Sequence, residues 1–73
     1  MTPYENLANA IILRAVEDYR EALWDLEVNP RYPLALRTVS DVERFFRSGW
    51  FSALTSLDGV VLMKKLQKEC NVK

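Results

Sequence analysis

The chain has 73 residues, of which 49% are hydrophobic and 27% are charged, and its ten basic and ten acidic side chains give no net charge. A chain this short forms one domain at most, and one cysteine with no histidine excludes both an internal disulfide and a zinc site of cysteine and histidine ligands. Because so small a core stabilises a fold only weakly, we expect every large apolar side chain to be needed inside, with self-association as the remaining support.

Charge is unevenly distributed along the chain. Residues 1–30 carry six acidic and two basic side chains, whereas residues 31–73 carry four acidic and eight basic ones. This asymmetry fits attraction between helices of one molecule, head-to-tail association of copies, or a basic face for nucleic acid. We favour the first explanation because it needs no partner.

The start of the sequence lacks the pattern of a signal peptide, and no apolar run approaches the roughly 18 residues of a membrane span. We therefore expect a cytoplasmic protein without a membrane partner.

The first predicted helix covers residues 3–27. Thr2 is its expected N-cap, Pro3 suits the first helical position, and Glu5 completes a capping box with Thr2. Apolar residues then recur at steps of three and four, which is typical of one face of an amphipathic helix. They are Ala8, Ile11, Ile12, Ala15, Tyr19, Ala22 and Leu26. The alanines lie seven residues apart and would let a second helix approach closely, and Pro30 ends the helix.

The second predicted helix covers residues 34–47 and begins just after Pro33. Its apolar stripe consists of Leu36, Val39, Val42 and Phe46, which follow one another at helical spacing. A later start at Ser40, which opens a second capping-box pattern, is the alternative.

Residues 49–55 and 59–70 form the third and fourth predicted helices. Ser48 is the expected N-cap of the third helix, and Asp58 or Ser56 that of the fourth. The inward stripe of the fourth helix consists of Val61, Leu62, Leu66 and Cys70, and its lysines face water. We expect Cys70 to close this stripe as a small buried residue; the alternative is that the nearby lysines lower the pKa of its thiol.

The sequence therefore predicts an all-α fold, a small bundle of three main helices plus one short helix, in a single domain over residues 1–73. No segment alternates apolar and polar residues well enough to predict a strand. The expected core consists of Leu7, Ile11, Ala15, Tyr19, Leu26, Val39, Val42, Phe46, Phe51, Leu54, Leu62 and Leu66.

The segment of residues 44–51, RFFRSGWF, allows two interpretations. As a binding site, its arginines would contact phosphates and its rings would stack on bases. As a hinge in the core, it would point Phe46 and Phe51 inward and both arginines outward. We favour the hinge, because each aromatic side chain stabilises the fold by about 1.5 to 3 kcal/mol when buried and a small domain needs that contribution. One ring, Phe45 or Trp50, is expected to stay partly exposed.

Catalysis has little support, because the chain has no histidine, no glycine-rich phosphate loop and no metal-ligand spacing. We expect a non-enzymatic protein with no cofactor and no metal, which binds another protein or a second copy of itself. The alternative is a nucleic-acid-binding or regulatory module that uses the basic C-terminal half, although a neutral chain is unusual for a DNA-binding domain. The candidate contacts for either partner are Arg44, Arg47, Trp50, Lys64, Lys65 and Lys68.

The stretch DVERFFRSGWFSALT at residues 41–55, followed by Leu57-Asp58-Gly59 and a basic helix, resembles a group of short uncharacterised proteins. These proteins belong to prophages and integrated mobile elements of Gram-positive bacteria and share an ERFFRSxWF…LT…DG signature. The resemblance is close over residues 42–59 and loose over residues 4–69. Gly49 stands where the group more often has aspartate. The resemblance implies a mobile-element origin and action in the host cytoplasm; this origin also allows an inhibitor of a defence system, which no residue indicates.

Overall fold

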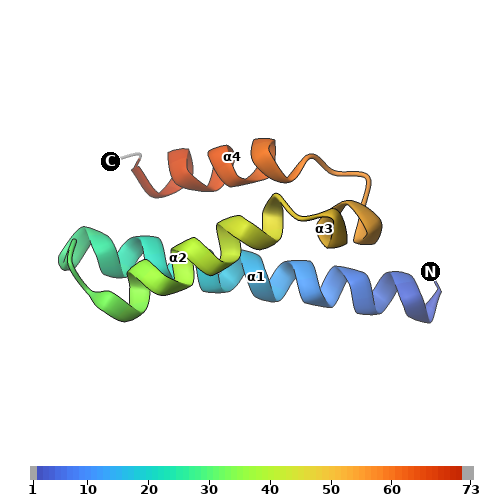
Figure 1. The fold of residues 1–73 in the computed structure, drawn as a ribbon, viewed down its shortest axis with the longest axis horizontal. Helices are drawn as coiled ribbons and strands as arrows, with labels where there is room; N and C mark the ends of the chain where they lie inside the picture. Colours follow the sequence, from blue (N-terminus) through green and yellow to red (C-terminus); the bar gives the residue numbers. More distant parts are fainter. Residues whose placement is uncertain (1, 72–73) are drawn as a thin grey trace.

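The structure, a computed structural model, describes residues 2–71 and folds them into four α-helices. They are α1 (Pro3–Val28), α2 (Pro33–Phe46), α3 (Gly49–Leu54) and α4 (Gly59–Asn71). Figure 1 shows α2 running back along α1, and α4 returning beside both, with the short α3 at the turn between α2 and α4. The described residues contain no strand, and the predicted all-α bundle of three main helices and one short helix is confirmed.

Side chains cap three of the four helices, at the positions that the sequence predicts. The hydrogen bonds run from Glu5 N to Thr2 Oγ1 (3.2 Å), from Phe51 N to Ser48 Oγ (3.2 Å) and from Val60 N to Asp58 Oδ1 (2.9 Å). Each satisfies a backbone N–H that has no partner inside its own helix. Asp58, rather than Ser56, is therefore the cap of α4.

Helix α2 begins at Pro33, so the alternative start at Ser40 is wrong. The side chain of its N-cap residue, Tyr32, makes no capping hydrogen bond, and the fixed φ of Pro33 suits the first turn instead. Thr38 Oγ1 donates a hydrogen bond to the carbonyl oxygen of Leu34 at 3.0 Å, which satisfies the hydroxyl within the helix. The helix therefore continues through the polar residues that made its start uncertain.

The first turn of α4 passes closely over the C-terminal end of α2. A Cβ atom added at Gly59 would overlap the backbone carbonyl oxygen of Phe46 and would lie 3.2 Å from Cδ1 of Phe51. At Gly49, by contrast, a Cβ atom would meet nothing within 4 Å. Glycine is thus required at residue 59 by the approach of two backbones, whereas residue 49 has room for a side chain.

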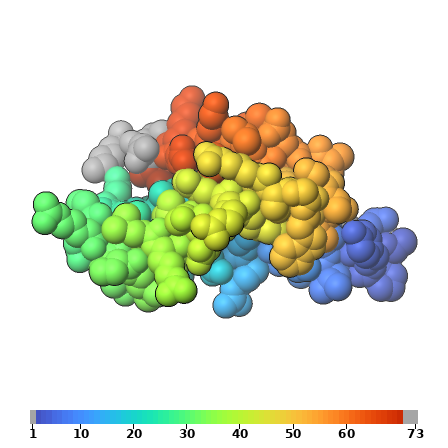
Figure 2. All heavy atoms as spheres, in the orientation of Figure 1, coloured from blue at the N-terminus to red at the C-terminus, as the bar shows by residue number. Residues whose placement is uncertain are grey.

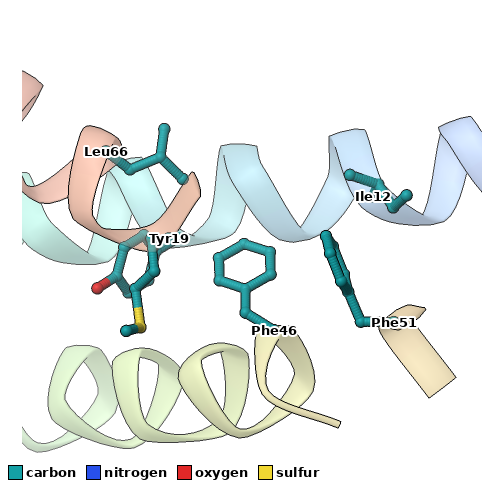
Figure 3. Packing of buried hydrophobic residues seen from close by; sticks show 6 residues of the cluster. Ile12, Tyr19, Phe46, Phe51 and Leu66 are labelled. Carbon is teal, nitrogen blue, oxygen red and sulfur yellow. The ribbon is translucent and has the colours of Figure 1, made fainter. Parts of the chain in front are cut away.

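The core lies where α1, α2, α3 and α4 meet. Its buried cluster consists of Ile12, Tyr19, Phe46, Phe51, Met63 and Leu66. Figure 3 shows the ring of Phe46 between Tyr19 and Phe51, with Ile12 and Leu66 completing the cluster from α1 and α4. The ring centroids of Phe46 lie 5.8 Å from Tyr19 and 5.5 Å from Phe51, and both pairs meet edge to face. This geometry is the favoured one for aromatic pairs.

One expected core residue, Leu7, and one residue of the predicted inward stripe of α4, Val61, lie on the surface instead. Leu7 is 62% exposed, because the neighbouring Ala8 takes the inward position on α1. Figure 2 shows the N-terminal turns of α1 projecting beyond the rest of the molecule. On α4, Val61 is 48% exposed and Met63, which the predicted stripe omits, is buried. Both helices are thus rotated slightly from the orientation that the sequence suggests.

Within residues 2–71, one ion pair between helices runs against the uneven charge along the chain. Arg20 of α1 pairs with Glu69 of α4 at 3.0 Å, which joins a base of the acidic segment to an acid of the basic segment. The explanation that we favour from the sequence, attraction between the acidic first helix and basic later helices, would instead pair acids of α1 with bases of the later helices. Separately, no helix within residues 2–71 has the length and hydropathy of a membrane-crossing segment.

Candidate functional site

The aromatic segment that suggested a binding site is divided between core and surface. Phe46 and Phe51 are 2% and 1% exposed, Phe45 is half-buried, and Trp50 is 60% exposed. The ring of Phe45 contacts those of Trp50 and Phe51 at centroid distances of 5.4 and 5.6 Å. We call these four residues the aromatic hinge. The predicted inward and outward positions are confirmed, and Trp50 is the ring that remains available to a partner.

Arg44 and Arg47 lie on the outer side of α2, as expected. Both are exposed, and within residues 2–71 neither forms an ion pair. They line an open hollow of about 540 Å³ together with Leu36, Val39, Ser40, Glu43 and Ser48. This hollow offers two guanidinium groups beside a carboxylate, so it is not uniformly basic.

The structure does not bring the six predicted contact residues together. Trp50 lines a different hollow from the two arginines, on the α1 side of α2. Lys64, Lys65 and Lys68 are exposed along the outer face of α4. The candidates therefore occupy three surfaces, of which the one at Trp50 is the most apolar.

A groove runs between α1 and α2, and we call it the α1/α2 groove. Its first part, about 280 Å³, is lined by Ile11, Arg14, Ala15, Asp18, Asp41, Val42, Phe45 and Trp50. Its second part, about 290 Å³, is lined by Asp18, Glu21, Ala22, Asp25, Tyr32, Leu34, Ala35 and Thr38. Asp18 lines both parts, so they adjoin. In Figure 2 α2 lies across the front of the molecule and α1 appears along its lower edge.

The two parts of the groove differ in chemistry. The first part has an apolar wall of Ile11, Val42, Phe45 and Trp50, and the exposed Leu7 lies one helical turn before Ile11. The second part is acidic, with Asp18, Glu21 and Asp25 along α1. Arg14 is the one basic residue among the described lining, and its Nε lies 3.4 Å from Oδ1 of Asp18. The groove therefore offers an apolar end followed by a negatively charged stretch.

A hydrogen-bonded polar triad of Tyr19, Glu43 and Gln67 joins α1, α2 and α4. The hydroxyl of Tyr19 donates to Oε2 of Glu43 at 2.8 Å and accepts from Nε2 of Gln67 at 2.8 Å, and Gln67 also donates to Glu43 at 3.3 Å. Burial, with the nearby Glu43 carboxylate, raises the pKa of Tyr19 to about 12, and the hydrogen bond from Gln67 opposes this shift. The phenol is thus neutral at physiological pH, and the triad fixes the three helices relative to one another.

Among the described residues, the cysteine and the clustered acidic side chains do not assemble into a further site. Cys70 is buried, and burial raises the pKa of its thiol above the usual value, so the suggestion that the nearby lysines lower it is wrong. Within residues 2–71, no three histidine, cysteine, aspartate or glutamate side chains lie close enough to hold a metal ion.

Sequence reasoning missed most of the α1/α2 groove. Ile11 and Val42 appear in the sequence as core positions, and only the pairing of α1 with α2 shows that they also border a groove. One signal was present, because the excess of acids in residues 1–30 implied a negatively charged face on the first helix. Asp41 carried no such signal, since it lies in the basic half of the chain.

Comparison with protein-family models, with curated protein sequences and with solved structures finds no match to this chain.

Proposed function

We propose that this chain is a non-enzymatic accessory protein that binds another protein, and that the apolar part of the α1/α2 groove is the contact surface. The observation that carries the proposal is Trp50, which is 60% exposed in a domain that needs its aromatic side chains inside. Tryptophan is among the residues that contribute most to protein interfaces.

The surroundings of Trp50 support the same conclusion. Ile11, Val42 and Phe45 extend its apolar surface along the groove. Tyr4 and Leu7, 60% and 62% exposed, continue it toward the start of α1, and the hydroxyl of Tyr4 donates to the carbonyl oxygen of Ala53 in α3 at 3.3 Å. Contiguous apolar surface with charged residues at its rim is typical of a site for another protein.

The setting of this function is the one that the resemblance implies, a phage or mobile element acting in the host cytoplasm. The tagged chain, used as bait in a lysate of a Gram-positive host, should retain a partner that the Trp50→Ser variant loses. Trp24→Ser is a matched control, because Trp24 is 55% exposed on α1 and lies outside the groove. Equal retention by both variants would contradict the assignment of the groove, and a chain that stays monomeric and retains nothing would contradict protein binding.

Nucleic-acid binding is the second candidate, and the exposed Arg44, Arg47 and α4 lysines favour it. An interface with phosphates binds most tightly at low salt, because binding releases counterions. A mobility shift with generic DNA therefore tests it, and failure to bind at about 50 mM salt would remove this candidate.

A further inference from the structure

The acidic and basic surfaces of the molecule face in different directions and do not neutralise each other. Within residues 2–71, neither the groove residues Glu21, Asp25 and Asp41 nor the lysines of α4 form an ion pair. The groove lining described above includes no residue of α4. In Figure 1 α4 lies along one edge of the α1/α2 pair. One molecule thus presents two complementary surfaces that it cannot bring together itself.

The outer face of α4 has the composition that the groove would accept. Val61 and the three lysines at positions 64, 65 and 68 lie at steps of three and four residues, so they share one face of the helix. All four are exposed, with Val61 at 48%, and Leu57 just before the helix is 58% exposed. This face therefore begins apolar and becomes basic, in the same order in which the groove begins apolar at Trp50 and becomes acidic.

From these two surfaces we infer that the occupant of the α1/α2 groove is a second copy of this chain, which inserts the outer face of its α4. Val61 and Leu57 of the second copy cover the apolar end near Trp50, and its lysines lie over Asp18, Glu21 and Asp25. The inference rests on the proposed function and names the partner of the same groove.

Helix dimensions agree with this arrangement. Helix α4 has 13 residues and α2, which forms one wall of the groove, has 14, so each is about 20 Å long. The acids of α1 recur at positions 18, 21 and 25, and the lysines recur with the same helical period. Successive lysines of one copy can therefore meet successive carboxylates of the next.

Because the groove and the outer face of α4 lie on different sides of the molecule, two copies cannot satisfy each other reciprocally. Each copy that accepts an α4 still presents its own α4 to a further copy. Such contacts are head to tail and form a ring or an open chain of copies, rather than a twofold dimer. A contact of one helix in one groove is small, so the assembly forms at micromolar concentrations.

Two charge-reversal variants test the inference by blocking one surface each. The tail variant carries Lys64→Glu, Lys65→Glu and Lys68→Glu, and the groove variant carries Glu21→Lys, Asp25→Lys and Asp41→Lys. Sedimentation velocity at roughly 10 to 500 μM, a range that brackets micromolar affinity, should show the mass of the unmodified chain rising with concentration. Each variant alone should stay monomeric. An equimolar mixture should associate again with increasing concentration, since the native α4 of one variant fits the native groove of the other and the two reversed surfaces also carry opposite charges.

The dependence of the association on ionic strength is an independent test of the inference. Raising the ionic strength from about 0.1 to about 1 M shortens the Debye length from ~10 to ~3 Å, so the association of the unmodified chain should weaken about tenfold or more. Both variants should remain folded, because all six replaced positions are at least partly exposed. Circular dichroism melts of both variants check this.

The results that would overturn the inference differ from those that would overturn protein binding. An unmodified chain that stays monomeric throughout the concentration range excludes the second copy as occupant, and so does a mixture of variants that fails to pair while the unmodified chain associates. A twofold dimer that both variants form unchanged also excludes it. In each case, retention of a host partner that depends on Trp50 leaves the proposed function intact.

Discussion

The aromatic hinge and the polar triad both include residues of α2, and they hold the helices of the bundle together by different physical interactions. In the hinge, four rings contact one another around the bend between α2 and α3; three pairs meet edge to face, and the rings of Phe45 and Phe46 are tilted by 41°. In the triad, three polar side chains exchange hydrogen bonds among α1, α2 and α4. Tyr19 connects the two regions, because its ring meets that of Phe46 edge to face while its hydroxyl donates a hydrogen bond to Glu43.

The two regions respond to different changes in the molecule and its surroundings. Dispersion and burial in the hinge depend on shape and change little with pH. Hydrogen bonds in the triad depend on protonation and on having every partner present. Substitutions in the hinge should therefore change the stability of the fold through the side-chain volume that they remove or add. Substitutions in the triad should change it by leaving polar groups without a hydrogen-bond partner.

The largest effect is expected from Phe46→Ala. Removing this ring leaves a cavity between Tyr19 and Phe51, which should lower the free energy of unfolding by about 3 to 5 kcal/mol. So large a loss approaches the whole stability of a domain of this size, so the variant should be mostly unfolded at 25 °C. Urea titration followed by circular dichroism measures it. A variant that retains most of its stability would show that the hinge is not the main source of stability.

A pair of glycine substitutions tests the close packing of the hinge. Gly59→Ala places a Cβ atom against the backbone of Phe46 and should destabilise the fold by about 3 kcal/mol. Gly49→Ala, in open space inside a helix, should instead stabilise it by about 0.4 to 1 kcal/mol. Thermal denaturation compares the stability of the two variants. A similar effect at both positions would contradict the close approach of Gly59 to the backbone of Phe46.

Alkaline pH should weaken the triad while the hinge is unaffected. Tyr19 ionises near 10 in the unfolded chain and near 12 in the folded one, so its contribution is complete below about pH 10 and is lost as the pH rises through 12. The loss amounts to at most about 3 kcal/mol. Urea titrations at about pH 9 and pH 11 measure it. Tyr19→Phe should remove this part of the pH dependence, and Tyr4→Phe, at an exposed tyrosine, should leave it unchanged.

The smallest effect is expected from the arginines that flank the hinge. Arg44→Ala and Arg47→Ala should each change the free energy of unfolding by less than about 0.5 kcal/mol, because both side chains are exposed and form no ion pair within residues 2–71. Thermal denaturation measures this. A loss above 1 kcal/mol would mean that the hollow on α2 contributes to the core.

The hinge could be predicted from the sequence and the triad could not. Local signals predict the start and the end of each helix to within one residue. Thr2, Ser48 and Asp58 cap α1, α3 and α4, and Pro33 begins α2. The triad joins residues 24 and 48 positions apart, and their contact exists only after three helices have packed. Pairing at this range leaves no pattern in a single sequence.

Dependence on tertiary packing also explains why the sequence places Leu7 and Val61 inside when both are exposed. Apolar positions on α1 and α4 come in adjacent pairs or triples, such as Leu7 with Ala8 and Val61 through Met63. Periodicity identifies the stripe, but the rotation of the helix against its neighbours decides which member faces inward. Gly59 is a similar case: its place after Asp58 indicates a turn, and only the tertiary fold shows that a backbone passes over it.

Cys70, buried on the last turns of α4, is a natural chemical probe of how often this helix detaches from the bundle. The thiolate of Cys70 is the nucleophile that attacks an alkylating reagent and displaces its leaving group, and both burial and the raised pKa of the thiol suppress this reaction while α4 is docked. The rate of alkylation therefore reports how often α4 detaches from α1 and α2, relative to unfolding of the whole chain. Since the chain has no other cysteine, this reading of local opening requires no engineered label.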